Sequence, residues 1–286
     1  MIRLATLLGY GDNLISLSLL ERLNSHLDIQ VVGTQITTAV CTLMSRPPLI
    51  SEVLLPDVAS FYTLRQSGLA AALRDSFHFR RWADQVLRPN DTLIVEKKDI
   101  RNQLLLLGHP CRLLQIERVE GAYLDRQRTI ENLLGKRLLE RPRPQITPAQ
   151  RIVINPSARA RDRHLPKEIV EQVQNVANGL GLVLSVVDTT GSYDFMRGKV
   201  DRYLYKPTLL AAAAELRAGQ RYIGPDSFFM HLAFYYGVPH LGFFWPHDTY
   251  FAPPGTLENG SFYFYSDISN ATRFEDRLTN FLLSGC

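Results

Sequence analysis

A short apolar strand, a glycine-containing turn and an amphipathic helix follow one another at the start of the sequence, and this order limits the folds open to the chain. Residues 3–8 are apolar and β-prone, Gly9-Tyr10-Gly11-Asp12 has turn composition, and residues 13–23 carry apolar side chains at helical spacing. Together they predict a βα unit. Further apolar runs predict more parallel strands, at 29–32, 52–55, 92–95 and 112–116.

A proline-rich segment then interrupts the pattern. Three prolines fall between residues 142 and 148, which prevents a helix and favours an extended connector. We therefore predict two domains, 1–144 and 145–286. The β-turn-α pattern starts again at Arg151. The predicted strands of the second half are 151–156, 182–187, 220–224 and 238–244, and its predicted helices are 166–179, 208–218, 228–236 and 274–283. Two Rossmann-like α/β domains facing each other across a cleft are the predicted fold.

Composition excludes several other classes of protein. The chain has 286 residues, of which 45% are hydrophobic and 21% charged, as in a soluble globular protein with a sizeable core. No apolar stretch approaches the roughly 20 residues of a membrane-spanning helix, and the first residues do not resemble a signal peptide. A cytosolic protein is expected. The three cysteines and seven histidines show no metal-ligand spacing, so neither a disulfide framework nor a metal site is predicted.

The positive charge is concentrated in the first half of the chain. Residues 1–150 carry 19 Lys and Arg against 15 Asp and Glu, whereas residues 151–286 carry 13 of each. Most of the basic residues are Arg, whose planar guanidinium suits phosphate and carboxylate groups. The excess indicates either an anionic partner or, as the favoured interpretation, a solvated basic face. Nucleic-acid binding is the least favoured function, because the basic residues do not form one stripe with interleaved aromatics.

Three segments lie just after a predicted strand and before a predicted helix, at 9–13, 155–166 and 224–233. Gly9 and Gly11 do not complete a GxGxxG motif, because no third glycine follows. In the other two segments, free N–H groups at a helix N-terminus could hold phosphates. Arginines at 159, 161 and 163 would add charge-assisted contacts, so a diphosphate is the expected ligand.

Taken together, the three segments resemble glycosyltransferase family 9, whose best-known members are bacterial heptosyltransferases. The order and spacing of the segments match over nearly the whole chain. The most specific one is the Asp-Ser-x-x-x-His-Leu-Ala-x-x-x-Gly-x-Pro block that begins at Asp226 and ends at Pro239. The resemblance implies a GT-B fold, a nucleotide donor in the C-terminal domain, no metal, and inversion at the anomeric carbon.

Asp12 is the predicted catalytic residue. An acceptor hydroxyl that attacks an anomeric carbon needs a base to take its proton, and a carboxylate is a common one. Asp12 stands at the family's base position. The alternative is a turn or helix N-cap residue, because Asp is favoured at caps and Asn13 could share that role. The spacing alone favours the cap, whereas the resemblance favours the base.

The predicted donor site lies in the second half of the chain. Arg163 matches the basic position near the donor phosphates, and His231 is expected either to touch the diphosphate or to be a buried core histidine. Asp188 follows a predicted strand, where a carboxylate can bind ribose hydroxyls. The remaining predicted donor-binding residues are Ser157, Arg159, Asp226 and Ser227, of which Arg159 could equally be a solvated loop residue.

Two bulky residues depart from the family pattern. Phe228 stands where the family has glycine after Asp-Ser, and Trp245 replaces a glycine in the later segment 244–248. Such side chains would narrow or reshape the donor pocket, stack on the nucleobase, or mark a loss of activity.

The sequence thus predicts an inverting, metal-independent glycosyltransferase without a cofactor other than its nucleotide-sugar donor. The expected acceptor is a bacterial surface glycan, such as lipopolysaccharide, or its lipid-linked precursor. Peripheral contact with the inner membrane would suit such an acceptor. Two alternatives stay open, a nucleotide-sugar epimerase of the same fold and a non-catalytic binding or partner subunit.

Overall fold

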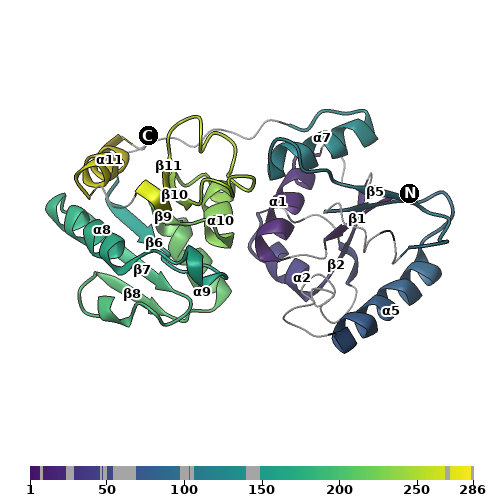
Figure 1. Cartoon of the computed structure of the whole chain (residues 1–286), viewed down its shortest axis with the longest axis horizontal. Helices are drawn as coiled ribbons and strands as arrows, with labels where there is room; N and C mark the ends of the chain where they lie inside the picture. The colour runs from purple at the N-terminus through teal and green to yellow at the C-terminus, as the bar shows by residue number, and fades with distance from the viewer. Residues whose placement is uncertain are drawn as a thin grey trace. The chain divides into compact units, whose positions relative to one another are not determined.

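The structure of the chain is a computed structural model that divides into two compact units, Met1–Arg141 and Pro142–Cys286 (Figure 1). The boundary predicted after residue 144 falls close to this division, and the predicted connector, 140–148, lies outside the described residues. So do residues 7–8 and 54–55, which end two predicted strands. The described residues are 1–6, 9–23, 29–45, 47, 50–53, 69–96, 103, 106–139, 149–267 and 271–284.

The first unit contains a parallel sheet with strand order β3-β2-β1-β4-β5. The strand order reverses between β1 and β4, which is the switch point at whose carboxyl ends open α/β sheets bind ligands. Each predicted strand is present. The strands are β1 (Ile2–Thr6), β2 (Ile29–Gly33), β3 (Ile50–Val53), β4 (Thr92–Val95) and β5 (Arg112–Gln115).

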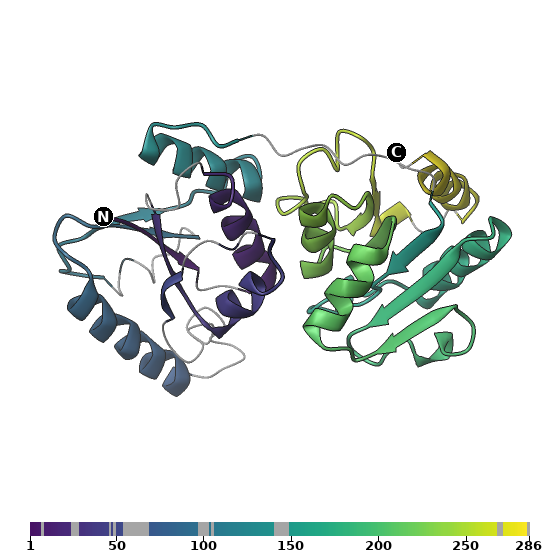
Figure 2. The same cartoon turned by 180° about the vertical axis from the view of Figure 1, so that it is seen from behind.

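Helices cover both faces of this sheet (Figures 1 and 2). Helix α5 (Leu69–Val86) packs Phe79 and Trp82 against Val32 and Leu93 of the sheet. Helices α1 (Tyr10–Leu20), α2 (Gln35–Cys41) and α7 (Ala122–Leu134) lie on the opposite face.

The start of α1 corrects the sequence analysis. The helix begins at Tyr10 and not at Asn13, because the backbone N–H of Asn13 donates to the carbonyl oxygen of Gly9 and closes the first turn (3.0 Å). Gly11 and Asp12 are therefore helical and do not form the predicted turn. Every residue of α1 from Asn13 to Leu20 is buried, so this helix is fixed by packing along most of its length.

The second unit contains a six-stranded parallel sheet with the order β11-β10-β9-β6-β7-β8. Counted from β6, this is the doubly wound order of dinucleotide-binding folds, and its switch point lies between β6 and β9. The sequence predicted neither β8 nor β11. The strands are β6 (Arg151–Ile154), β7 (Val183–Asp188), β8 (Arg202–Tyr205), β9 (Arg221–Pro225), β10 (His240–Phe244) and β11 (Phe262–Phe264).

Both faces of this second sheet are covered as well. Ile152 and Ile154 pack in the core that includes residues of α8 and α11, and Val153 points to the other face, next to the end of α9. A strand that is buried on both faces is expected to be apolar throughout, which explains the continuous run in β6. The helices are α8 (Lys167–Gly179), α9 (Leu209–Ala218), α10 (Phe228–Tyr236) and α11 (Ala271–Ser284).

Gly224 in β9 is tightly packed, next to the switch point of the second unit. A Cβ added there would lie 2.3 Å from the hydroxyl of Tyr222 and 2.7 Å from the carbonyl oxygen of Asn155. We expect Gly224→Ala to lower the free energy of unfolding by about 1–3 kcal/mol, because backbone must shift to admit the methyl group. Urea denaturation measures this change.

Gly179→Ala is the matched control. Gly179 is an exposed helical residue with no atom within 4 Å of an added Cβ, and alanine favours the helix by up to about 1 kcal/mol. Equal unfolding midpoints for the two variants would contradict the packing described for Gly224.

Candidate functional site

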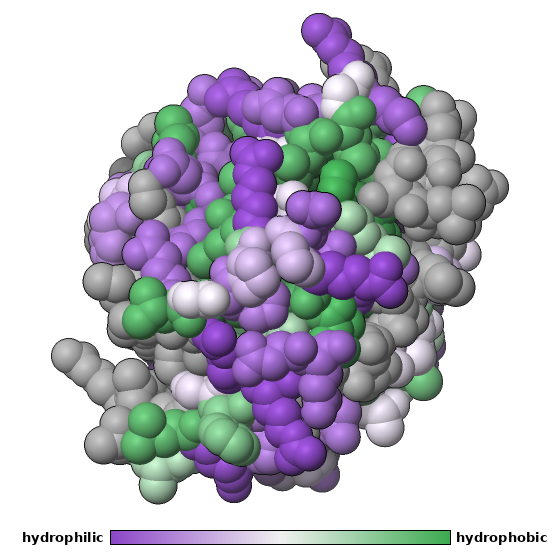
Figure 3. Space-filling model, turned by 90° about the vertical axis from the view of Figure 1, so that its right-hand side faces the viewer, coloured by the Kyte–Doolittle hydropathy of each residue, from purple (hydrophilic) through white to green (hydrophobic). Residues whose placement is uncertain are grey.

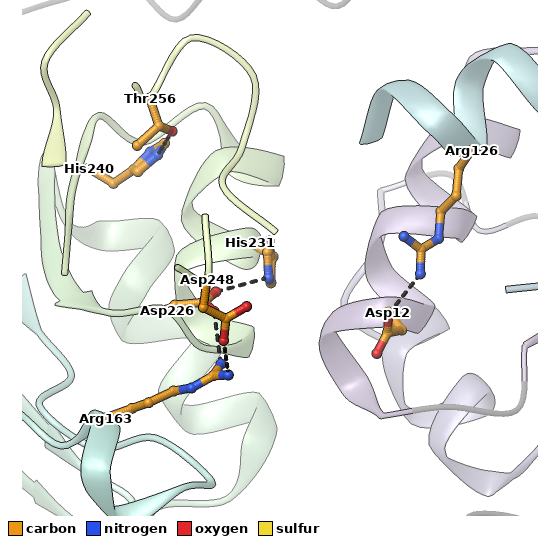
Figure 4. Close-up of polar contacts among 8 residues, drawn as sticks. All are labelled: Asp12, Arg126, Arg163, Asp226, His231, His240, Asp248 and Thr256. Carbon is orange, nitrogen blue, oxygen red and sulfur yellow. Dashed lines mark hydrogen bonds and ion pairs between the residues drawn. The ribbon is translucent and has the colours of Figure 1, made fainter. Parts of the chain in front are cut away.

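An arginine and two carboxylates meet at the carboxyl end of the second sheet (Figure 4). Arg163 comes from the loop after β6, and Asp226 follows β9 directly, so the two flank the switch point. Nη1 of Arg163 donates to Oδ2 of Asp226 at 2.8 Å. Its Nη2 donates to Oδ2 of Asp248, in the loop that follows β10. This arrangement places a guanidinium where nucleotide phosphates bind in such folds.

Backbone and tyrosine hydrogen bonds hold the loop that carries Arg163 in place. The backbone N–H of Leu165 donates to the carbonyl oxygen of Pro156 (2.9 Å), and the buried hydroxyl of Tyr193 contacts the carbonyl oxygens of both residues. The hydroxyl of Tyr265 donates to the carbonyl oxygen of Arg163 itself. Burial raises the pKa of the Tyr193 and Tyr265 hydroxyls, so both stay protonated and act as donors. The loop therefore presents Arg163 from a fixed backbone.

The two carboxylates that pair with Arg163 differ in solvent exposure. Two carboxylates share one guanidinium, and Nε2 of His231 lies 3.8 Å from Oδ1 of Asp226. The side chain of Asp226 is 7% exposed, whereas that of Asp248 is 28% exposed. An anion that displaces a carboxylate from Arg163 meets Asp248 more readily, because Asp248 is the more accessible of the two.

The other predicted donor-binding residues lie on the same edge of the second sheet, in different surroundings. Ser157 is buried, with its hydroxyl oxygen 3.2 Å from that of Thr190. Arg159 is exposed on the Arg163 loop. Ser227 is the N-cap residue of α10, but its side chain makes no capping hydrogen bond.

Asp188 has a different role from the predicted one. It is fully buried, and its carboxylate accepts hydrogen bonds from the backbone N–H groups of Thr190, Gly191 and Tyr193 and from the hydroxyl of Tyr203. Burial raises the pKa of this carboxyl, but these hydrogen bonds outweigh burial and lower it overall. Asp188 thus orders the segment that carries Tyr193. The predicted contact with ribose is therefore no part of the site that we propose.

The two bulky departures from the family pattern pack against other aromatic rings. The Trp245 ring lies 4.9 Å from that of Tyr265, the residue that holds the Arg163 backbone, and it stacks on His247 at 6.2 Å. Phe228 is the first residue of α10 and packs edge-on against Phe229. Trp245 therefore packs against Tyr265, the residue whose hydroxyl holds the Arg163 backbone.

In the first unit, Asp12 pairs with a buried arginine (Figure 4). Nη2 of Arg126, on α7, donates to Oδ1 of Asp12 at 2.7 Å. The N-cap of α1 is Gly9, and no side chain caps it, so the alternative of Asp12 as a cap residue is wrong. In the first turn of the helix, the carboxylate still interacts favourably with the helix dipole. Its side chain is 24% exposed.

Two polar side chains fix the start of α1 beside Asp12. The Asn13 amide donates to the carbonyl oxygen of Gly9 (3.1 Å) and accepts from the hydroxyl of Thr37 on α2 (2.7 Å). The side chains of Asn13 and Thr37 are both buried. Sequence reasoning missed Thr37 and Arg126, which lie outside the motifs. It also missed Asp248, which ends the segment 244–248 and contacts Arg163 only after folding.

Among the described residues, no group of three His, Cys, Asp or Glu side chains could hold a metal ion. In that same part of the chain, no helix is both long and apolar enough to cross a membrane.

Comparison with solved structures places the fold among glycosyltransferases. The E. coli heptosyltransferase WaaC with ADP-2-deoxy-2-fluoro heptose aligns with a TM-score of 0.64 and 12% identity, over 92% of each chain. A family 9 glycosyl transferase from Veillonella parvula aligns with a TM-score of 0.58 and 15% identity, over 99% of this chain and 93% of that one. E. coli ADP-heptose lipopolysaccharide heptosyltransferase II gives 0.58 and 14%, over 98% of both chains.

The chain therefore has the fold of heptosyltransferases, and the predicted fold class is confirmed. The family resemblance read from the motifs is likewise confirmed at the level of the fold. No protein-family model and no curated protein sequence matches the chain.

The pH dependence of stability tests the burial of His240, at the start of β10. Burial lowers the pKa of its ring to about 4, and its Nε2 lies 2.9 Å from the hydroxyl of Thr256. An unfolded histidine has a pKa near 6.5, so acid protonates the unfolded chain first. Neutral His240 therefore does not lower the free energy of unfolding above pH 6.5, and this free energy falls as the pH decreases towards 4.

We expect the wild-type unfolding midpoint in urea to fall between pH 7.5 and pH 5, and to fall less in His240→Gln. His78→Gln, at an exposed position on α5, should keep the wild-type pH dependence. The same pH dependence in the wild type and His240→Gln would show that His240 is not held neutral.

Proposed function

We propose that this chain is an inverting, metal-independent glycosyltransferase of the heptosyltransferase type, which moves a sugar from a nucleotide-sugar donor to a bacterial surface glycan such as lipopolysaccharide. The observation that carries the proposal is the match of fold, over 92% of the chain, to a heptosyltransferase whose structure was determined with an ADP-sugar. The position of the Arg163 cluster at the switch point of the second sheet supports it. An ADP-sugar is the first donor to test.

In this proposal, Arg163 stabilises the leaving diphosphate. Negative charge builds on the leaving group as the sugar departs, so a guanidinium that binds it more tightly in the transition state lowers the barrier. The N-terminus of α10 lies next to Asp226, and its partial positive charge adds to that of Arg163. His231, one turn further along α10, lies against Asp226 and orients it.

Asp12 acts as the base. As the acceptor oxygen bonds to the anomeric carbon, its proton moves to the carboxylate, and the bond between that carbon and the diphosphate oxygen breaks with its electron pair leaving on the diphosphate. The partial exposure of Asp12 supports this role, because a base must be reachable from solvent or substrate.

A cytoplasmic location with peripheral contact at the inner membrane is part of the proposal, since the acceptor would be lipid-borne. The basic excess of the first 150 residues supports it. So does α5, which exposes Leu73 and Phe77 one helical turn apart, with Arg74 and Arg81 exposed on the same helix. Figure 3 shows hydrophobic side chains interspersed among hydrophilic ones on this side of the first unit.

Binding of ADP tests the role of Arg163 without an acceptor. Arg163→Ala should weaken the affinity about 10-fold or more, because a charge-assisted hydrogen bond contributes about 1.5–3 kcal/mol. Asp248→Asn should strengthen it, because one of the two carboxylates that compete with the diphosphate is then neutral. Isothermal titration calorimetry measures both affinities.

Arg202→Ala is the control, since Arg202 is an exposed arginine at the start of β8, at the edge of the second sheet opposite the strands' carboxyl ends. Its affinity should equal that of the wild type. Equal ADP binding by the wild type, Arg163→Ala and Arg202→Ala would remove Arg163 from the donor site.

Turnover tests the role of Asp12. Asp12→Asn should lower the transfer rate by about 10²–10⁴-fold, the usual contribution of a general base, and leave the affinity for ADP unchanged. The measurement is ADP release from the ADP-sugar in the presence of an acceptor glycan. Asp84→Asn makes the same change at an exposed carboxylate of the same unit and should retain wild-type activity.

The alternatives are separated by following the donor as well as ADP. Conversion of the donor to another nucleotide-sugar, without acceptor and without net ADP release, would favour an epimerase. ADP binding without turnover, together with unchanged cellular glycan in Asp12→Asn, would favour a non-catalytic subunit, an alternative that the two carboxylates on Arg163 and the bulky Trp245 support.

A further inference from the structure

Arg126 is a buried charge with no direct role in the proposed mechanism. Its side chain is 2% exposed, and each of its three guanidinium nitrogens has a partner. Nη2 donates to Oδ1 of Asp12 at 2.7 Å, Nε to the hydroxyl of Ser16 at 3.1 Å, and Nη1 to the carbonyl oxygen of Ala122 at 3.1 Å. A planar guanidinium held at three corners cannot rotate. It therefore fixes the position of any carboxylate bound to it.

The network continues from Arg126 to the other side of the switch point. Ser16 lies one helical turn after Asp12 on α1, and its hydroxyl donates to Oε1 of Glu96 while it accepts from Arg126. Glu96 directly follows β4, the strand next to β1 at the point where the strand order reverses. Asp12 is thus the partly exposed end of a network whose other members, Arg126, Ser16 and Glu96, are buried.

We propose that Arg126 is the positioning residue of Asp12, an inference that rests on the proposed function. Arg126 binds Oδ1 and leaves Oδ2, which has no hydrogen-bond partner within the described part of the chain, to receive the proton of the acceptor hydroxyl. The fixed carboxylate needs no reorientation when the acceptor arrives.

Stability alone explains this arrangement poorly. Burying an ion pair costs desolvation energy that the attraction between its charges often only balances, and apolar residues of similar volume can stabilise a fold as well. A role in stability also does not require that the acidic partner stays partly exposed. The exposure of Asp12 beside the full burial of Arg126 is what a positioned base needs.

Arg126→Lys and Arg126→Met test the proposal in the full chain, with kcat and KM for transfer measured. Lysine keeps the charge and cannot reproduce three fixed contacts, so kcat should fall about 10-fold or more while the KM for the donor stays unchanged. Arg126→Met removes all three contacts, so its kcat should fall at least as far. Arg128→Met is the control, because Arg128 lies on the same helix and makes an exposed ion pair with Glu120.

A double-mutant cycle shows whether Arg126 acts through Asp12. In an Asp12→Asn background, replacing Arg126 by Lys should cause no further loss of kcat, because the group that it positions is already disabled. Equal losses in both backgrounds would overturn the proposal. So would a wild-type kcat in Arg126→Lys, the variant that retains the charge should Arg126→Met fail to fold.

Failure of this inference is distinguishable from failure of the proposed function. If Asp12→Asn loses activity while the Arg126 variants do not, Asp12 is the base and Arg126 does not position it. Wild-type activity in Asp12→Asn would refute the proposed base and the positioning residue together.

Discussion

The reversal of strand order in each sheet is the constraint on which the rest of the molecule depends. Where neighbouring parallel strands connect to helices on opposite faces, their carboxyl ends leave room for side chains from the segments that follow the two strands to meet. In the second unit those side chains are Arg163 and Asp226, and in the first unit they are Asp12 and Glu96, joined through Arg126 and Ser16. Both charge clusters are therefore products of topology.

The two clusters use arginine differently. Arg163 is partly exposed and shared by two carboxylates, so it can exchange a partner for an anionic ligand. Arg126 is buried, and its three guanidinium nitrogens are all bonded, so it cannot make such an exchange at similar cost. Burial thus separates an arginine suited to binding from an arginine suited to positioning, although both are paired with aspartate.

The sequence predicted most of the fold because its strands are short apolar runs bounded by turns. The bounds of β4 and α10 agree with the prediction. Helix α7 was missed because its polar residues hide the helical spacing, and Arg126 within it resembles an exposed charge until α1 covers it. β11 was missed because it has only three residues.

The candidate site was predictable only in part. The family resemblance pointed to Asp12, Arg163 and Asp226, but partners such as Asp248 lie far away in sequence and come together only in the folded unit. Asp188 shows how a carboxylate's position alone can mislead, since its predicted contact with ribose stays a prediction. A carboxylate after a nucleotide-binding strand fits ribose by position, yet here three backbone N–H groups and one tyrosine hydroxyl already occupy it. Position within a fold does not tell which partners a side chain finds.

A crystal structure of the protein saturated with an ADP-sugar would test the central claim most directly. The account predicts the diphosphate on the guanidinium of Arg163, with Asp248 displaced from it and Asp226 still in contact. A bound nucleotide that leaves Arg163 paired with both carboxylates, or that binds away from the carboxyl ends of β6 and β9, would contradict it.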